Sequence, residues 1–266
     1  MRSLRILLAV VTSVALTGCI NSTTLIKLKA DGSGTVEQTT LMNTAALKAM
    51  MPGAEKQMGG GVVNKADLER TAARMGKGVR LVSAEPTKGA NGFEGSKAIF
   101  AFDDINQIQV SQGPSMSGST DGRVDAAPTT EDPVRFTLTQ SGGTSKLTIA
   151  FVDKPGGSSQ GGTSSDMPDL TNPMMMGMIK SMFAGFKLNI DLEVAGSIVT
   201  TNAEYVTGSR LTLLEMDMDS LLADEAKLKA LQSKLGPEAS LSAIKPYLKD
   251  IKGIKVDGPT ISVEFK

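Results

Sequence analysis

The stretch TLIKLKADGSGTVEQTTLM, residues 24–42, has the clearest pattern of secondary structure in this chain. Leu25, Lys27 and Lys29 alternate with Ile26, Leu28 and Ala30, and a second strand-like run extends from Val36 to Leu41. Asp31-Gly32-Ser33-Gly34 between the two runs supplies typical turn residues. Alternation with a period of two on both sides of an Asp-Gly turn predicts a β-hairpin.

Several later segments have the same strand-like character, and helical segments lie between them. Strands are expected at 79–84, 97–102, 187–194, 198–206 and 210–214, with hairpins at 134–152, around Gly142-Gly143, and at 253–266, around Asp257-Gly258-Pro259. Helices are expected at 44–51, 64–78 with Asn64 as its cap, 171–186, 219–235 and 240–251. Helices followed by paired strands are typical of the α+β class. We therefore expect a twisted antiparallel sheet of several hairpins, with helices packed on one face.

Two stretches rich in Gly and Ser, at 111–132 and 153–169, are predicted to be long, flexible loops. They lie on either side of one strong hairpin. Because a single hairpin cannot fold stably by itself, the loops are interpreted as insertions in one sheet rather than as linkers between domains. Residues 25–266 are therefore expected to form a single domain.

The first residues, MRSLRILLAVVTSVALTGC, have the features of a secretory signal peptide. Arg2 and Arg5 form a positive region, and an apolar run extends from Ile6 to Leu16. That run is too short to cross a bilayer, which takes about 20 apolar residues as a helix. The alternative is a buried N-terminal helix, but nothing after Cys19 continues a helical pattern.

Leu16-Thr17-Gly18-Cys19 resembles the lipobox of bacterial lipoproteins. The resemblance implies that a diacylglyceryl group is attached to the sulfur of Cys19 and that the chain is cut between Gly18 and Cys19. It also implies that the new amino terminus is acylated, commonly with palmitate. Residues 1–18 would then be the signal peptide, and 19–24 the lipidated end with a short polar tether.

Such an anchor would hold the domain at a membrane in the cell envelope, because two or three acyl chains bind far better than one. Ile20, after Cys19, is not the Asp that commonly retains lipoproteins at an inner membrane. In a Gram-negative cell we expect the outer membrane, facing the periplasm. Otherwise we expect the outer face of the plasma membrane. Cys19 is the chain's only cysteine, so a packed core rather than disulfides must stabilise the domain.

Composition argues against several classes of function. Lys and Arg together number 28, as do Asp and Glu, so there is no excess of positive charge for binding nucleic acid. The chain has no histidine, which removes Ser-His and Cys-His pairs and the commonest metal ligand. We therefore expect no cofactor, no metal and no catalytic residues. A hydrolase that uses carboxylates or a Ser-Lys pair is the alternative, although no spacing marks such a pair.

The sequence EMDMDS, residues 215–220, contains the best cluster of carboxylates. On a strand, Glu215, Asp217 and Asp219 would share one face and could bind a hard cation through oxygen. The interpretation we prefer is that Asp217 or Asp219 caps a helix beginning near Ser220.

A methionine-rich segment lies in the helix expected at 171–186. Met175, Met178, Met182 and Phe186 would fall on one face, with Met174 and Met176 partly elsewhere. Methionine is flexible and polarisable, which suits an adaptable apolar surface for a ligand, a membrane or a partner. The alternative is an ordinary helix packed on the sheet.

Cys19, the early segment LIKLKADGSGTVEQTTLMN and the late segment GSRLTLLEMDMDSLLAD resemble bacterial lipoproteins of the LppM-like family. The resemblance implies a β-rich α+β domain without established enzymatic activity, and it transfers only Cys19 as a functional residue. We expect a non-enzymatic, membrane-anchored envelope lipoprotein that binds a hydrophobic ligand or a protein partner. The alternative is a structural or assembly component whose long loops serve as attachment segments.

Overall fold

The computed structural model describes residues 20–43, 63–111, 133–151, 183–224, 226–228, 241–249 and 251–266, together with 174, 176, 177 and 180. Several sequence predictions lie outside these residues: the signal peptide, Gly18 and Cys19, the helix at 44–51, nearly all of both Gly- and Ser-rich loops, and Met175, Met178 and Met182. These predictions stay predictions.

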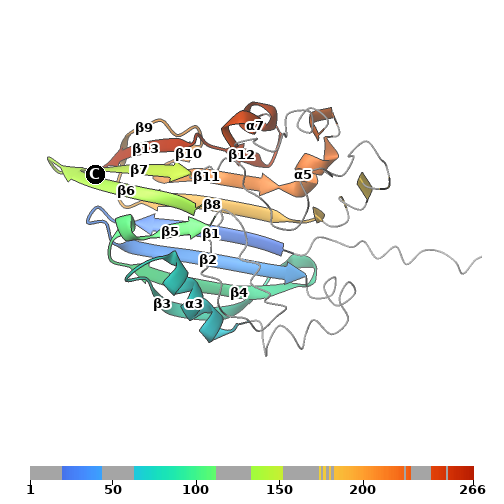
Figure 1. Cartoon of the computed structure of the whole chain (residues 1–266), viewed down its shortest axis with the longest axis horizontal. Coiled ribbons are helices and arrows are strands. Elements are labelled where there is room, and N and C mark those ends of the chain that lie inside the picture. Colours follow the sequence, from blue (N-terminus) through green and yellow to red (C-terminus); the bar gives the residue numbers. More distant parts are fainter. Residues whose placement is uncertain are drawn as a thin grey trace, which may run out of the picture.

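The described residues form two twisted sheets and a few short helices, which confirms the α+β class (Figure 1). The eight-stranded sheet has the order β10-β11-β8-β1-β2-β4-β3, with β12 also paired to β11, and the five-stranded sheet has the order β5-β6-β7-β13-β9. The larger sheet consists of β1 (Ile20–Leu28), β2 (Gly34–Asn43), β3 (Arg80–Lys88), β4 (Phe93–Phe102), β8 (Lys187–Val194), β10 (Val206–Thr207), β11 (Arg210–Asp217) and β12 (Ile254–Val256). The smaller sheet consists of β5 (Gln109–Ser111), β6 (Pro133–Ser141), β7 (Thr144–Phe151), β9 (Ile198–Thr201) and β13 (Thr260–Phe265).

The described α-helices are short: α3 (Lys65–Met75), α5 (Met218–Ala223) and α7 (Leu241–Leu248). Two single 3-10 turns, η1 (Ala90–Gly92) and η2 (Ile105–Gln107), flank β4. Asn64 caps α3 as predicted, because its side chain accepts hydrogen bonds from the backbone N–H groups of Ala66 and Asp67. The helix predicted at 219–235 is interrupted at Asp224, whose carboxylate accepts from Lys227 N at 3.0 Å and so starts a new turn.

The first predicted hairpin is confirmed, but it begins earlier than expected. β1 and β2 pair without a break from Ile20 opposite Met42 to Leu28 opposite Gly34. Residues 20–24, predicted to be a tether, are therefore strand. The polar side chains of residues 21–24 suggested a solvated linker, yet the backbone of these four residues pairs with β2 on one side and β8 on the other, and Ser22 and Thr24 are buried. Backbone hydrogen bonds in the middle of a sheet therefore hold these residues as strand although their side chains are polar.

The expectation of one antiparallel sheet was incomplete in two respects. The strands divide between two sheets, and β1 pairs with β8 in parallel. The inner face of the larger sheet was predicted to be covered by helices alone. In the structure, side chains of the five-stranded sheet also pack against it.

The predicted closing hairpin at 253–266 is wrong. Ile254 pairs with Met216 in the larger sheet, whereas Ile261 pairs with Ile149 in the smaller one. Asp257 forms the corner between these strands, with its carboxylate accepting from Glu204 N at 3.1 Å and Gly258 N at 2.7 Å. Each strand buries its apolar side chains better against the core from its own sheet, so the two do not pair with each other.

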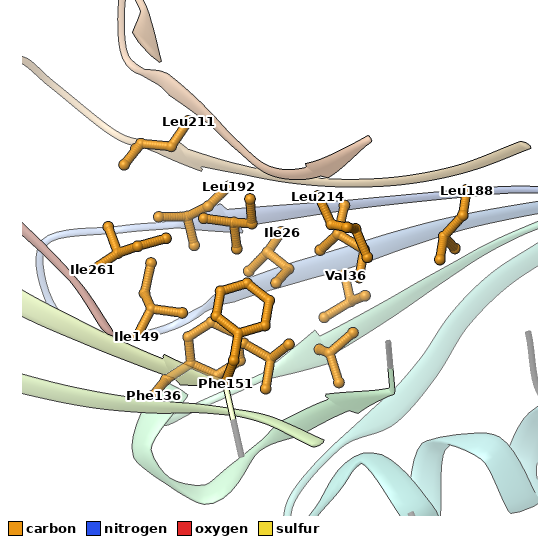
Figure 2. Close-up of a cluster of buried hydrophobic side chains, with 14 of the residues drawn as sticks. Ile26, Val36, Phe136, Ile149, Phe151, Leu188, Leu192, Leu211, Leu214 and Ile261 are labelled. Carbon is orange, nitrogen blue, oxygen red and sulfur yellow. The ribbon is translucent and has the colours of Figure 1, made fainter. Parts of the chain in front are cut away.

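The core lies between the two sheets, and Figure 2 shows side chains from both pointing toward one another. Ile26, Val36 and Leu192 come from the inner face of the larger sheet, and Ile149 and Ile261 come from the smaller sheet. All five are fully buried. Burial of apolar side chains at this density is the main stabilising contribution to such a fold.

Candidate functional site

The parallel pairing of β1 with β8 brings two distant parts of the chain together. Asn21 is opposite Lys187, so both strands start at the same end of the sheet. We call this the proximal end, defined by Ile20, Asn43, Phe93, Lys187 and Asp217. Figure 1 shows the start of β1, the arrowhead of β2 and α5 at this end, on the right of the view. The chain that precedes β1 contains Cys19, and the chain that precedes β8 is the methionine-rich segment.

The described part of the methionine-rich segment is helical at Met174, Met176, Lys180 and Phe183. Met176, Phe183 and Phe186 are partly buried against the core, whereas Met174 is 83% exposed. The rings of Phe183 and Phe186 pack edge to face with centroids 6.3 Å apart. Phe186 therefore belongs in part to the core, while Met174 presents a large apolar side chain to the surroundings.

Backbone hydrogen bonds hold this segment against α5. Met218 N donates to Phe186 O at 3.0 Å, and Gly185 N donates to the carboxylate of Asp219 at 2.7 Å. The position of residues 185 and 186 at the proximal end is thus set by a helix that lies far along the chain.

The carboxylate cluster of residues 215–220 is engaged in structural contacts. Asp217 caps α5, as predicted, with its carboxylate accepting from Asp219 N and Ser220 N. It also pairs with Lys187 at 2.8 Å, and this contact raises the pKa of Lys187. Glu215 pairs with Lys255 at 2.6 Å. Within the described ranges, no three Asp, Glu, Cys or His side chains are grouped so as to hold a metal ion.

An open depression of about 300 Å³ lies near the proximal end, and its polar side chains include Thr23, Thr39 and Asn189 of the outer face. These three residues lie in one row across β2, β1 and β8. The lining consists of Asn21, Ser22, Thr23, Thr39, Leu41, Lys187, Leu188, Asn189, Glu215, Met216 and Asp217.

Sequence reasoning missed two buried acceptors on this outer face. Oδ1 of Asn189 and Oδ1 of Asp191 are buried and have no hydrogen-bond partner, and Asp191 is only 8% exposed. The alternation in KLNIDLEV indicates that both residues face away from the core, which predicts exposure rather than burial. An unpartnered buried oxygen is costly, so a group that donates hydrogen bonds would be favoured here.

A second open depression, of about 460 Å³, lies at the opposite, distal end of the sheet. Three ion pairs involve charged residues of its lining: Arg80 with Asp103 at 2.9 Å, Glu193 with Arg210 at 2.6 Å, and Lys27 with Glu37. The contact with Lys27 lowers the pKa of Glu37. Ser33 Oγ donates to Asp31 at 2.7 Å instead of meeting a lysine. The described residues give no evidence of a catalytic site.

Comparisons with known proteins find little. No protein-family model matches this chain, and no curated protein matches its sequence. One solved structure, the NMR structure of the folded domain of Mycobacterium tuberculosis LppM, is similar over 94% of this chain and 91% of that domain. The identity is 10% and the TM-score is 0.35, which is a loose likeness and says nothing about function.

None of the helices among the described residues is long and apolar enough to span a membrane.

Proposed function

We propose that this chain is a non-enzymatic lipoprotein of the cell envelope, anchored through acyl groups on Cys19. The N-terminal sequence supports the anchor: a basic start, a short apolar run and Leu-Thr-Gly-Cys. The start of β1 at Ile20 is in accord with it, since cleavage before Cys19 would leave every described strand intact. The domain would face the periplasm from the outer membrane of a Gram-negative cell, or lie on the outer face of the plasma membrane otherwise.

The surface of the larger sheet is the part of the domain that we propose for binding. The space between the sheets is filled by side chains such as Phe100, Phe102 and Phe265, and both depressions are open to solvent. This arrangement favours contact with a protein partner over enclosure of a hydrophobic ligand. The polar side chains of Thr23, Thr39 and Asn189, which lie in one row beside the depression, suit hydrogen bonds with such a partner. A structural or assembly role in the envelope would use the same contacts.

The anchor is tested by the variant Cys19→Ser, expressed in the source cell with an alkyne analogue of palmitate. The wild-type protein should incorporate the analogue and give an N-terminal peptide that starts at a diacylated Cys19. The variant should lose both the label and the membrane association that survives a salt wash. Thr23→Ala, an exposed change four residues away, is the control and should behave like the wild type. Equal labelling of wild type and Cys19→Ser would refute the anchor.

The binding face is tested with a photo-crosslinking amino acid placed at Thr39, beside Thr23 and Asn189. In intact cells we expect a stoichiometric protein adduct from this position and none from Val199, an exposed control in the smaller sheet. The adduct should weaken severalfold in the background of Asn189→Leu, which removes the acceptor. Lipid adducts would instead favour a hydrophobic ligand, and identical adducts from both positions would contradict a specific face.

A further inference from the structure

The proximal end of the sheet combines the predicted anchor with an apolar rim. One residue before the Asn21–Lys187 pair, Ile20 begins β1 and Phe186 precedes β8. Met42 lies opposite Ile20 in β2, and the helical turn that ends at Phe183 leads into Phe186. Figure 1 shows the described helical pieces of the methionine-rich segment at this end, on the right beside α5. We call Ile20, Met42, Met174, Met176, Phe183 and Phe186 the apolar rim. Residues more than 130 positions apart in the sequence thus lie at one edge of the molecule.

The rim is only partly covered by the protein. Ile20, Met42, Met176, Phe183 and Phe186 are all half-buried, and Met174 is exposed. Met174, at 83%, has the largest exposed fraction among the exposed large apolar side chains of the described residues. Methionine is the side chain that best adapts to an irregular apolar surface.

The length of chain between the anchor and the rim determines how far the rim can lie from a bilayer. Ile20 is already in β1, so a single peptide unit, about 3.4 Å in extended form, separates it from Cys19. Acyl groups on Cys19 would insert among the lipids and bring the proximal end to the level of the headgroups. A flexible tether would have left the domain free to rotate away, but Ile20 is paired with β2 and residues 21–24 are paired on both sides.

The charges at the proximal end are largely paired with one another. Lys187 pairs with Asp217, and Lys88 pairs with Glu94 at 3.3 Å. Attraction to anionic lipids needs an excess of Lys or Arg, which these pairs do not supply. Contact with a membrane here would therefore depend on burial of apolar side chains at the interface.

We propose that the apolar rim lies against the surface of the lipid bilayer, so that the proximal end of the larger sheet is at the membrane and its distal end points away. The proposal rests on the proposed acylation of Cys19. In this orientation the turn between β1 and β2 and the turn between β6 and β7 point away from the membrane, and the outer face with Thr39 and Asn189 stays open to a partner. The occupant of the rim is the bilayer itself.

The experiment uses the acylated full-length product, purified and reconstituted into vesicles of phosphatidylethanolamine and phosphatidylglycerol. Cys19 is the only native cysteine, and its thioether does not react with thiol reagents, so one introduced cysteine can carry a fluorophore. Met174→Cys places the fluorophore on the rim. Val199→Cys, an exposed apolar position in β9, is the matched control. Nitroxide-bearing phospholipids then report contact with lipid by quenching.

Quenching at position 174 should exceed quenching at position 199 at least threefold. Quenching at position 174 should be as strong in vesicles of phosphatidylcholine alone as in vesicles that contain phosphatidylglycerol. Equal quenching at the two positions, quenching that requires anionic lipid, or shielding of position 174 from aqueous iodide without nitroxide quenching would overturn the proposal. Mass spectrometry of the N-terminal peptide separates the two hypotheses. An acylated Cys19 with no quenching at 174 overturns the orientation alone, whereas a free Cys19 overturns both.

Discussion

Asp217 is the residue on which the proximal end depends most. Its carboxylate caps α5 through two backbone N–H groups and also pairs with Lys187 at the start of β8. It therefore connects the end of β11, the first turn of α5 and the strand that follows the methionine-rich segment. The two contacts can be separated experimentally, because asparagine is as good a cap as aspartate but carries no charge.

Asp217→Ala should lower the free energy of unfolding by about 1–2 kcal/mol, since both the cap and the ion pair are lost. Asp217→Asn should cost no more than about 1 kcal/mol, because only the partly exposed ion pair is lost. Urea unfolding with unchanged m-values would measure both. If the two variants lose the same free energy, the cap contributes nothing to stability.

Asp257, at the corner between β12 and β13, should make stability depend on pH. Burial raises the pKa of its carboxyl above the ordinary value of 3.8, despite two backbone N–H donors that lower it. The folded protein therefore holds this proton to a higher pH than the unfolded chain. The contribution of Asp257 to stability is fully present below pH 3.8 and is lost as pH rises through the folded pKa.

In Asp257→Asn that loss should be absent. The free energy of unfolding of the variant minus that of the wild type should rise between pH 4 and pH 7, measured by urea unfolding at several pH values. Other carboxyls, such as Glu37 with its lowered pKa, contribute equally to both proteins and cancel in the difference. A difference that is constant with pH, or that falls as pH rises, would show that burial does not raise the pKa of Asp257.

At the scale of elements, the strand pairs of the larger sheet depend on close backbone packing at Gly95. A Cβ atom at this position would overlap with Thr40 O of β2 and come within 2.8 Å of Leu41 Cα. Both atoms are backbone, which cannot turn aside as a flexible side chain can. β2 and β4 pair from Gly34 opposite Phe102 to Asn43 opposite Phe93, and Gly95 lies opposite Leu41, so a local separation would strain this pairing near its proximal end.

Gly95→Ala should therefore destabilise the protein by about 1–3 kcal/mol, in the range seen when a packed site is overfilled. Gly177→Ala is the control, because Gly177 is helical and a Cβ there meets no atom within 4 Å. It should raise stability by about 0.5–1 kcal/mol through the better helix propensity of alanine. Thermal and urea unfolding should rank the three proteins in the same order, and a neutral Gly95→Ala would contradict the close approach.

Elements that depend on neighbouring residues could be predicted. The hairpin of β1 and β2, the cap of α3 by Asn64 and the cap of α5 by Asp217 follow from contacts within a few residues or across one turn. The sequence predicted a tether where residues 20–24 are strand, because the polar residues 21–24 are held as strand by pairing with β8, which starts more than 160 residues later.

At the scale of the whole molecule, the crossing from β12 to β13 makes the two sheets a single structural unit. β12 pairs with β11 in the larger sheet, and β13 pairs with β7 in the smaller one. Only three residues separate β12 from β13, and the side chains of both sheets meet in one core. Neither sheet can separate without exposing side chains such as Ile149, Ile261 and Leu192, all of which are fully buried. We therefore expect one cooperative unfolding transition.

Ile261→Ala should lower the free energy of unfolding by about 2–5 kcal/mol, and Ile261→Val by about 0.5–1.5 kcal/mol, because a cavity opens between the sheets. Fluorophores on Val82→Cys in β3 and Val199→Cys in β9 would follow each sheet, since both positions are exposed. The two probes should give one midpoint in each protein and shift together. Separate midpoints would show that the sheets unfold independently.

The sequence by itself determined the class of the fold, its first hairpin and its helix caps, and it predicted the anchor at Cys19. These features depend on residue type and spacing over a few positions. Only the tertiary structure decided which sheet each strand joins, that β1 and β8 run in parallel, and that the Oδ1 atoms of Asn189 and Asp191 are buried on the outer face. Pairing between strands distant in the sequence depends on which apolar faces can be buried together. The alternation of apolar and polar residues within one strand is the same whichever strand it pairs with, so it does not identify the partner.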